Sequence, residues 1–113
     1  MKILVIILNK EKFLDDILST MVELGIMGAT VIESTRMSEI LIREIPIFAG
    51  LREMRRSSRA YNRVIIATVE EKEIIPELLR LLKEMNINFS DPEMGVFFTI
   101  PIEDFSGSMD ELE

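Results

Sequence analysis

The chain has 113 residues, of which 48% are apolar, and its formal net charge is −7. This length suits one domain with a core of its own. The sequence contains no cysteine and no histidine, which excludes disulfides, thiolate zinc sites, cysteine nucleophiles and the most common general base. We therefore expect a globular protein that is not an enzyme, with no catalytic residues and no metal site.

The first apolar segment is KILVIIL at residues 2–8, and it predicts a strand. The run is rich in β-branched residues and stops at Asn9 and Lys10, so it is too short for a helix of ordinary length. No small-residue cleavage site follows it, and no apolar run approaches the ~20 residues of a membrane span. We expect a cytoplasmic protein without membrane insertion.

An amphipathic helix follows, and then a second strand. Apolar residues recur three and four positions apart, as on one face of a helix: Leu14, Ile17, Leu18, Met21 and Val22. Gly25 stands where a glycine commonly ends a helix. ATVIES at residues 29–34 then predicts the second strand.

The second half of the chain repeats this order. NRVIIATVE at residues 62–70 predicts a strand that is apolar on both of its faces. A second helical stripe follows: Ile75, Leu78, Leu79, Leu82 and Met85. Pro76 is tolerated only in the first turn, so this helix begins no earlier than about Lys72. MGVFFTIPI at residues 94–102 predicts the last strand.

The order strand–helix–strand–strand–helix–strand predicts an α+β protein with a ferredoxin-like βαββαβ sandwich. Residues 1–104 form this single domain, in which two helices cover one face of a four-stranded antiparallel sheet. The first and third strands are central, and Pro101 suits an edge position for the fourth. Residues 37–60 form a long loop between the second and third strands, and the acidic tail 105–113 is expected to fray.

The doubly apolar strands have a consequence for assembly. Alternate residues of a strand face opposite sides of the sheet, and two helices cover only one side. A monomer rarely exposes to water an apolar surface as large as one whole face of a sheet. We expect a homo-oligomer that covers the second face, the alternative being that loop 37–60 folds back over it.

Positive charge is concentrated in one segment. Residues 36–63 hold seven basic and three acidic residues, a local charge of +4, whereas the remainder holds six basic and 17 acidic residues, or −11. Four arginines of this segment would share a face if it were helical: Arg52, Arg55, Arg56 and Arg59. They are candidates for recognition of a phosphate or an acidic partner; alternatively, they form a solvated surface.

The opening MKILVIILNKEKFLDDILSTMVELGIMGATVIES resembles the beginning of PII-type nitrogen regulatory proteins, including ELGIMGATVIE with Gly25 and Gly28. Segment 37–60 is similar to the T-loop of that family, and EMGVFFTIPIEDF to its last strand. The resemblance implies a homotrimer of ferredoxin-like subunits that binds a small effector between subunits. It also implies that the T-loop contacts a target enzyme or transporter.

The resemblance also implies candidate ligand-binding residues. Thr30 matches the threonine that helps to hold adenine, and Gly95 matches a glycine of the phosphate-binding loop. Arg36 and Ser38 stand where the family has two glycines at the base of the T-loop. SDPEMGV at residues 90–96 lacks the family's lysine, and the tail lacks its arginine pair. The expected effector is thus an adenine nucleotide or another small anion, with ATP bound more weakly than in the family.

These inferences predict a divergent PII-like signal transduction protein that presents loop 37–60 to a protein target. Two alternatives stay open: a module that binds RNA or another polyanion through the arginines, and a structural trimer without a ligand. The acidic body and single tyrosine disfavour RNA, because base stacking requires aromatic side chains. We expect no nucleic-acid partner.

Overall fold

The computed structural model describes residues 1–48 and 61–112. Its centre is a four-stranded antiparallel sheet in the order β2-β3-β1-β4. The strands are β1 (Lys2–Leu8), β2 (Thr30–Thr35), β3 (Tyr61–Val69) and β4 (Gly95–Pro101). The predicted α+β, ferredoxin-like fold is confirmed, with the first and third strands at the centre and Pro101 at the end of an edge strand.

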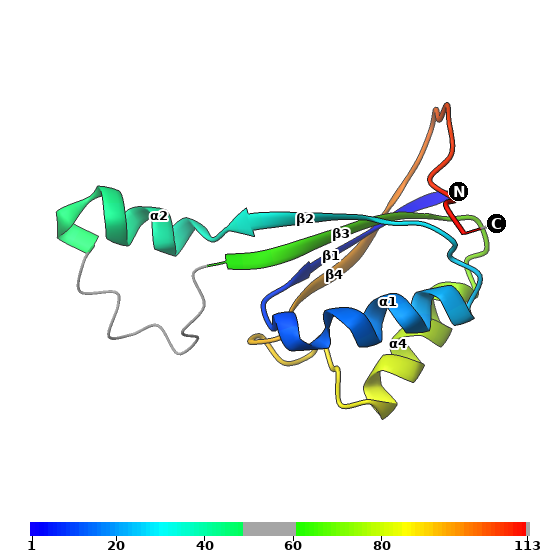
Figure 1. The fold of residues 1–113 in the computed structure, drawn as a ribbon, viewed down its shortest axis with the longest axis horizontal. Helices are drawn as coiled ribbons and strands as arrows, with labels where there is room; N and C mark the ends of the chain where they lie inside the picture. Colours follow the sequence, from blue (N-terminus) through cyan, green and yellow to red (C-terminus); the bar gives the residue numbers. More distant parts are fainter. Residues whose placement is uncertain (49–60, 113) are drawn as a thin grey trace.

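Two helices lie on one face of this sheet (Figure 1). They are α1 (Leu14–Glu23), preceded by the 3-10 turn η1 (Glu11–Phe13), and α4 (Ile74–Glu84). α1 ends as expected, since the Gly25 amide donates to the Val22 carbonyl and Gly25 has a positive φ of 90°. Pro76 lies in the first turn of α4, where its missing N–H removes no helical hydrogen bond.

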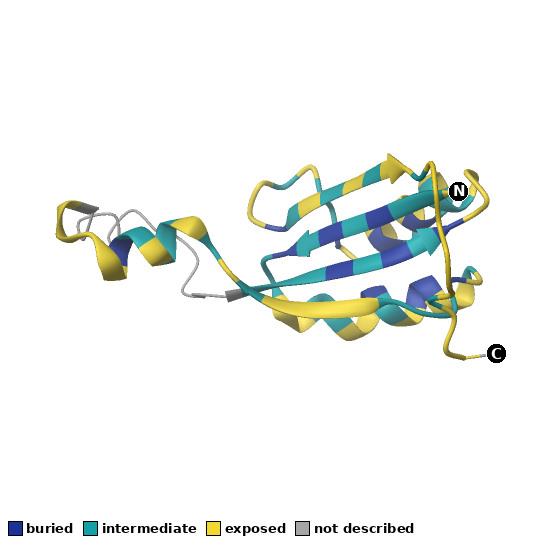
Figure 2. Cartoon of the chain, turned by 90° about the horizontal axis from the view of Figure 1, so that it is seen from above, coloured by how far each residue is buried: buried dark blue, intermediate teal, exposed yellow. Residues whose placement is uncertain are grey.

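The core lies between the helices and one face of the two central strands. Leu4, Ile6 and Leu8 of β1 are fully buried. Ile65, Ala67 and Val69 of β3 lie on the same side and are buried with them. Ile17 and Met21 of α1 and Leu78 and Leu82 of α4 complete this core. Burial therefore alternates along β1 and β3, as Figure 2 shows.

The opposite face of the sheet is apolar and has no helix over it in the described part of the chain (Figures 1 and 2). The strand register places nine apolar side chains on it: Ile3, Val5, Ile7, Ile32, Val64, Ile66, Val96, Phe98 and Ile100. Those of the two edge strands are 37–51% exposed. We call these nine residues the open face.

The segment between β2 and β3 differs from the predicted loop. Residues 37–60 begin with helix α2 (Met37–Glu44) and the 3-10 turn η2 (Pro46–Phe48). The Arg36 carbonyl accepts the Glu39 and Ile40 amides and so starts α2. Figure 1 shows α2 standing away from the sheet beyond the end of β2. Residues 37–48 therefore do not cover the open face.

The last residues also differ from the expected frayed tail. After β4, the chain crosses the end of the sheet (Figure 2) and returns to the turn that precedes β2. There the Glu111 and Leu112 amides both donate to the Met27 carbonyl, at 3.0 and 3.2 Å.

None of the helices among residues 1–48 and 61–112 has the length and apolar character needed to cross a bilayer.

Adjacent leucines of α4 allow a test of the core. Leu78 is fully buried whereas Leu79 is 37% exposed. Leu78→Ala should lower the free energy of unfolding by ~2–5 kcal/mol, because it leaves a cavity. Leu79→Ala, the control, should cost clearly less. Urea denaturation followed by circular dichroism measures both, and equal losses would contradict the described orientation of α4.

Candidate functional site

The sequence-predicted ligand residues lie at different places on the sheet. Thr30 is exposed and begins the edge strand β2, where it pairs with Ile66. Arg36 and Ser38 lie past the other end of β2, at the start of α2, and both are half-buried. The arginines at 52, 55, 56 and 59 lie outside the described residues, so their predicted recognition role stays a prediction.

One subunit does not bring these candidates together. Thr30 and Arg36 are separated by the length of β2, ~20 Å at 3.3 Å per residue. Gly95 lies at the same end of the sheet as Arg36 but on the opposite edge strand. From Gly95 to β2 there are three inter-strand spacings, or ~14 Å. A site that uses all four residues would have to combine more than one copy of the chain.

Gly95 also has a structural role. Its φ is +133°, a conformation that residues with a side chain rarely adopt. A Cβ at this position would collide with the main-chain carbonyl of Ile7 on β1. β4 therefore needs glycine here in order to begin pairing with β1, whether or not Gly95 contacts a ligand.

A polar row crosses three strands where the α2 segment leaves the sheet. Ser34 Oγ lies within hydrogen-bonding reach of the main-chain oxygen of Asn62, at 3.2 Å, and of its side-chain Oδ1. Asn62 Nδ2 donates to Asn9 Oδ1 at 3.3 Å. The register places Ser34 and Asn62 on the side of the open face, beyond its apolar residues, and Asn9 directly follows the last residue of β1. The row therefore ties β2, β3 and β1 together at the base of α2.

An ion-pair cluster reinforces the same end of the sheet from the helix side. Arg63 contacts Glu11 at 2.6 Å and Glu33 at 3.6 Å. Lys10 approaches Asp91 at 3.8 Å. Sequence analysis missed this cluster and the polar row, because the partners are distant in sequence and meet only through the strand register. Arg63 thus links β3 to the turn before α1 and to the edge strand β2.

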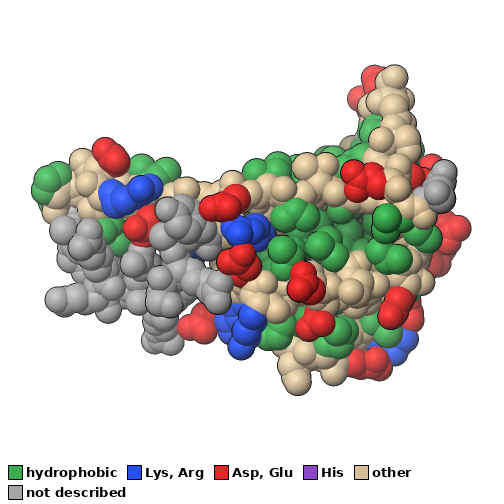
Figure 3. All heavy atoms as spheres, viewed as in Figure 1, with side chains coloured by type: hydrophobic (Ala, Val, Ile, Leu, Met, Phe, Trp, Pro, Cys, Tyr) green, Lys and Arg blue, Asp and Glu red, His purple; other side chains and the backbone are tan. Residues whose placement is uncertain are grey.

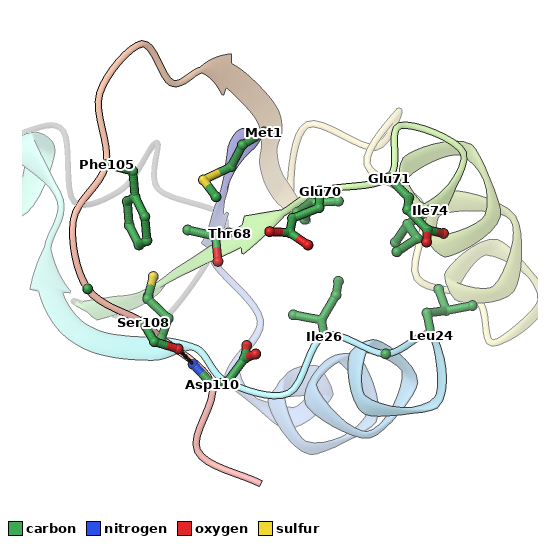
Figure 4. A pocket seen from close by; sticks show the side chains of 14 residues that line it. Met1, Leu24, Ile26, Thr68, Glu70, Glu71, Ile74, Phe105, Ser108 and Asp110 are labelled. Carbon is green, nitrogen blue, oxygen red and sulfur yellow. Dashed lines mark hydrogen bonds between the residues drawn. The ribbon is translucent and has the colours of Figure 1, made fainter. Parts of the chain in front are cut away.

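The opposite end of the sheet holds a cavity of about 340 Å³. Its walls come from the β3 end, the turn after α1 and the returning tail. Thr68, Glu70 and Asp110 point toward its centre, and Asp110 N donates to Ser108 Oγ at 3.1 Å (Figure 4). Sequence analysis did not predict this cavity, since it depends on the path of the tail.

A second, apolar groove of about 170 Å³ runs between α1 and β2. Leu18 and Val22 line it from the helix, Val31 from the strand and Leu112 from the tail. Hydrophobic side chains are visible between these two elements in Figure 3, which also shows several acidic groups around them. The tail thus contributes to the walls of both hollows.

Two observations bear on chemistry. Arg80 donates to Glu77 and contacts Glu84 at 2.9 Å on the exposed surface of α4, and the hydrogen bond from Arg80 lowers the pKa of Glu77. This is an ordinary surface pair within a helix. Among residues 1–48 and 61–112, no group of three or more His, Cys, Asp or Glu residues could hold a metal ion.

Comparison with known proteins gives no assignment. No protein-family model matches the chain, and no curated protein matches it significantly. The sheet, the segment that leaves it and the residues around them therefore carry the evidence for function.

Gly95 and Gly25 both have a positive φ, but only at Gly95 would an added methyl group also clash with a neighbouring atom. Gly95→Ala should destabilise the fold strongly, because the methyl group meets the Ile7 carbonyl. Gly25→Ala, the control, has open space around the added methyl group and should cost only the ~1 kcal/mol of an unfavourable backbone conformation. Thermal unfolding of both variants gives the comparison, and a Gly95→Ala protein as stable as the control would refute the steric explanation.

Proposed function

We propose that the protein is a non-catalytic, trimeric regulator of the PII-like type. It senses a small effector between subunits and presents segment 37–60 to a target enzyme or transporter. The observation that carries this proposal is the open face, considered together with the helix-bearing segment at one end of the same sheet. The trimer and the effector are taken from the resemblance in sequence, and the following features support them.

The open face supports assembly. Its edge-strand members are substantially exposed, with Val96 at 51%, Ile100 at 47% and Ile32 at 43%. Burial of apolar surface contributes roughly 25 cal/mol per Å², so a partner that covers the whole face gains much more than scattered surface contacts provide. Further copies of the chain are the simplest cover, and three copies related by a closed three-fold axis bring their open faces together.

The separation of the candidate ligand residues supports a site between subunits. Thr30 lies at one end of β2, whereas Arg36 and Ser38 lie beyond the other. If neighbouring copies pack through the open face, Thr30 of one copy would lie near Arg36 and Ser38 of the next. The effector is an adenine nucleotide or another small anion, bound without catalysis.

The segment at the base of α2 supports a role in presentation. The polar row and the Arg63 ion pairs fix the strands from which this segment leaves. Beyond that anchor, α2 exposes Met37 at 74% and Ile40 at 45%, and Ile47 in η2 is 83% exposed. Exposed apolar side chains beside a basic segment are suited to an acidic protein target with an apolar contact.

Assembly through the open face can be tested by substitution of two residues that are equally exposed in the subunit. Phe98 on the open face and Leu79 on α4 are both 37% exposed. Phe98→Asp should give folded monomers, because it places a charge in the proposed interface. Leu79→Asp should leave the oligomer intact. Size-exclusion chromatography with light scattering reports the mass; two variants that assemble alike would contradict the use of this face.

The recognition role can be tested in the basic segment. Arg55→Ala with Arg56→Ala should reduce ATP binding, measured by calorimetry, or binding of a target once one is identified, while the trimer persists. Arg80→Ala, which removes a surface arginine of α4, serves as the control. Loss of the trimer in the double variant would assign the arginines to scaffolding. Salt-sensitive RNA binding that disappears with them would favour the polyanion-binding alternative.

A further inference from the structure

The tail segment Phe105–Leu112, which we call the strap, joins the two edges of the sheet at one end. It starts after β4, where Ile102 N donates to the Met1 carbonyl at 3.2 Å. It then passes the ends of β1 and β3, lining the cavity opposite Thr68 and Glu70 (Figure 4). It finishes against the turn that leads into β2 (Figure 2).

The docking point depends on the absence of a side chain at Gly28. A Cβ at Gly28 would collide with the main-chain carbonyl of Met109. The close approach leaves the Met27 carbonyl free to accept the Glu111 and Leu112 amides, at 3.0 and 3.2 Å. Because Gly28 has no side chain, either the strap or a ligand can lie against its backbone, but the two cannot do so at the same time.

The attachment is confined to a small area. Beyond Ile102, the main-chain hydrogen bonds from the strap to the body, within the described residues, converge on the single Met27 oxygen. Gly107 has a φ of +108° with open space around it, and Leu112 is 62% exposed. A segment whose main-chain hydrogen bonds to the body end at one atom, with an exposed glycine between its ends, can detach without opening the core.

We propose that the strap is a releasable cover for the turn at Gly28, which leads into Thr30 and the ligand site. The inference rests on the proposed function, because it regulates the same inter-subunit site. Thr30 follows the covered turn by two residues, and the strap brings Asp110 and Glu111 to that place without any basic residue of its own. Docked, it covers the backbone at Gly28 and its carboxylates repel an anionic effector; released, it exposes that backbone and removes the repulsion.

Binding of an anion is therefore linked to release of the strap. A cover that is docked for about nine-tenths of the time lowers the apparent affinity about tenfold, since only the uncovered fraction binds. Conversely, an anion that binds only the uncovered site shifts the strap toward its released state, and more so as the anion concentration rises.

Calorimetry with ATP as the probe compares the full chain with a chain that stops after Ser106. The shortened chain should bind ATP about tenfold more tightly. The full-length variant Asp110→Asn with Glu111→Gln keeps the hydrogen bonds and should show a smaller gain. Equal, measurable affinities in the full and shortened chains would overturn the strap proposal alone. Absence of ATP binding in both would instead contradict the proposed function and, with it, the regulation of its site.

Hydrogen exchange tests docking without any ligand. The Glu111 and Leu112 amides should exchange slowly in the full chain and rapidly in Gly28→Ala, while the Ile65 amide of the core remains protected in both. Added ATP should accelerate exchange at Glu111 and Leu112 in the full chain. Exchange at these two amides as fast as in an unstructured peptide, before ATP is added, would overturn the proposal.

Discussion

The structure depends on the burial of two central strands that are apolar on both sides. Leu4, Ile6 and Leu8 are buried under the helices, and the residues between them, Ile3, Val5 and Ile7, point to the other side. Helices α1 and α4 pack against one face of the sheet, and in the described part of the chain no helix covers the other face. This asymmetry accounts for the stability of the subunit and for its expected tendency to assemble.

The side chains of the strands change from apolar to polar toward the end of the sheet at which α2 begins. The apolar positions of the open face give way to Ser34, Asn62 and Asn9, which bind one another across three strands. On the other side, Arg63 contacts Glu11 and Glu33. Polar contacts on both sides of the sheet thus hold the strand ends from which this segment leaves. Such a division between a rigid base and an extension suits a protein that signals through contact.

Most of the fold could be predicted from sequence because α1 and α4 carry clear helical periodicity and the strands are short apolar runs. Residues 2–8 match β1, and the other strands were predicted to within about one residue at each end. Helix α2 was missed although Met37, Ile40 and Leu41 have helical spacing, because the whole segment was interpreted as a loop. The strap was missed for a different reason: its small and acidic residues have no periodicity, and its docking depends on the space above Gly28.

Less of the candidate site could be predicted. The resemblance indicated Thr30, Arg36, Ser38 and Gly95, but a sequence does not show that a single subunit keeps Thr30 apart from Arg36. Gly95 illustrates a further limit, since its contact with the Ile7 carbonyl explains a glycine there without any ligand. The polar row and the cavity beside the strap arise from register and chain path, which no local pattern reports.

We expect other copies of the chain to cover the open face. Sedimentation equilibrium of the unmodified protein over a range of concentrations tests it most directly. A trimer gives a single species of about 39 kDa, three times the 13.0 kDa of the chain. A stable monomer of 13.0 kDa at every concentration would contradict it.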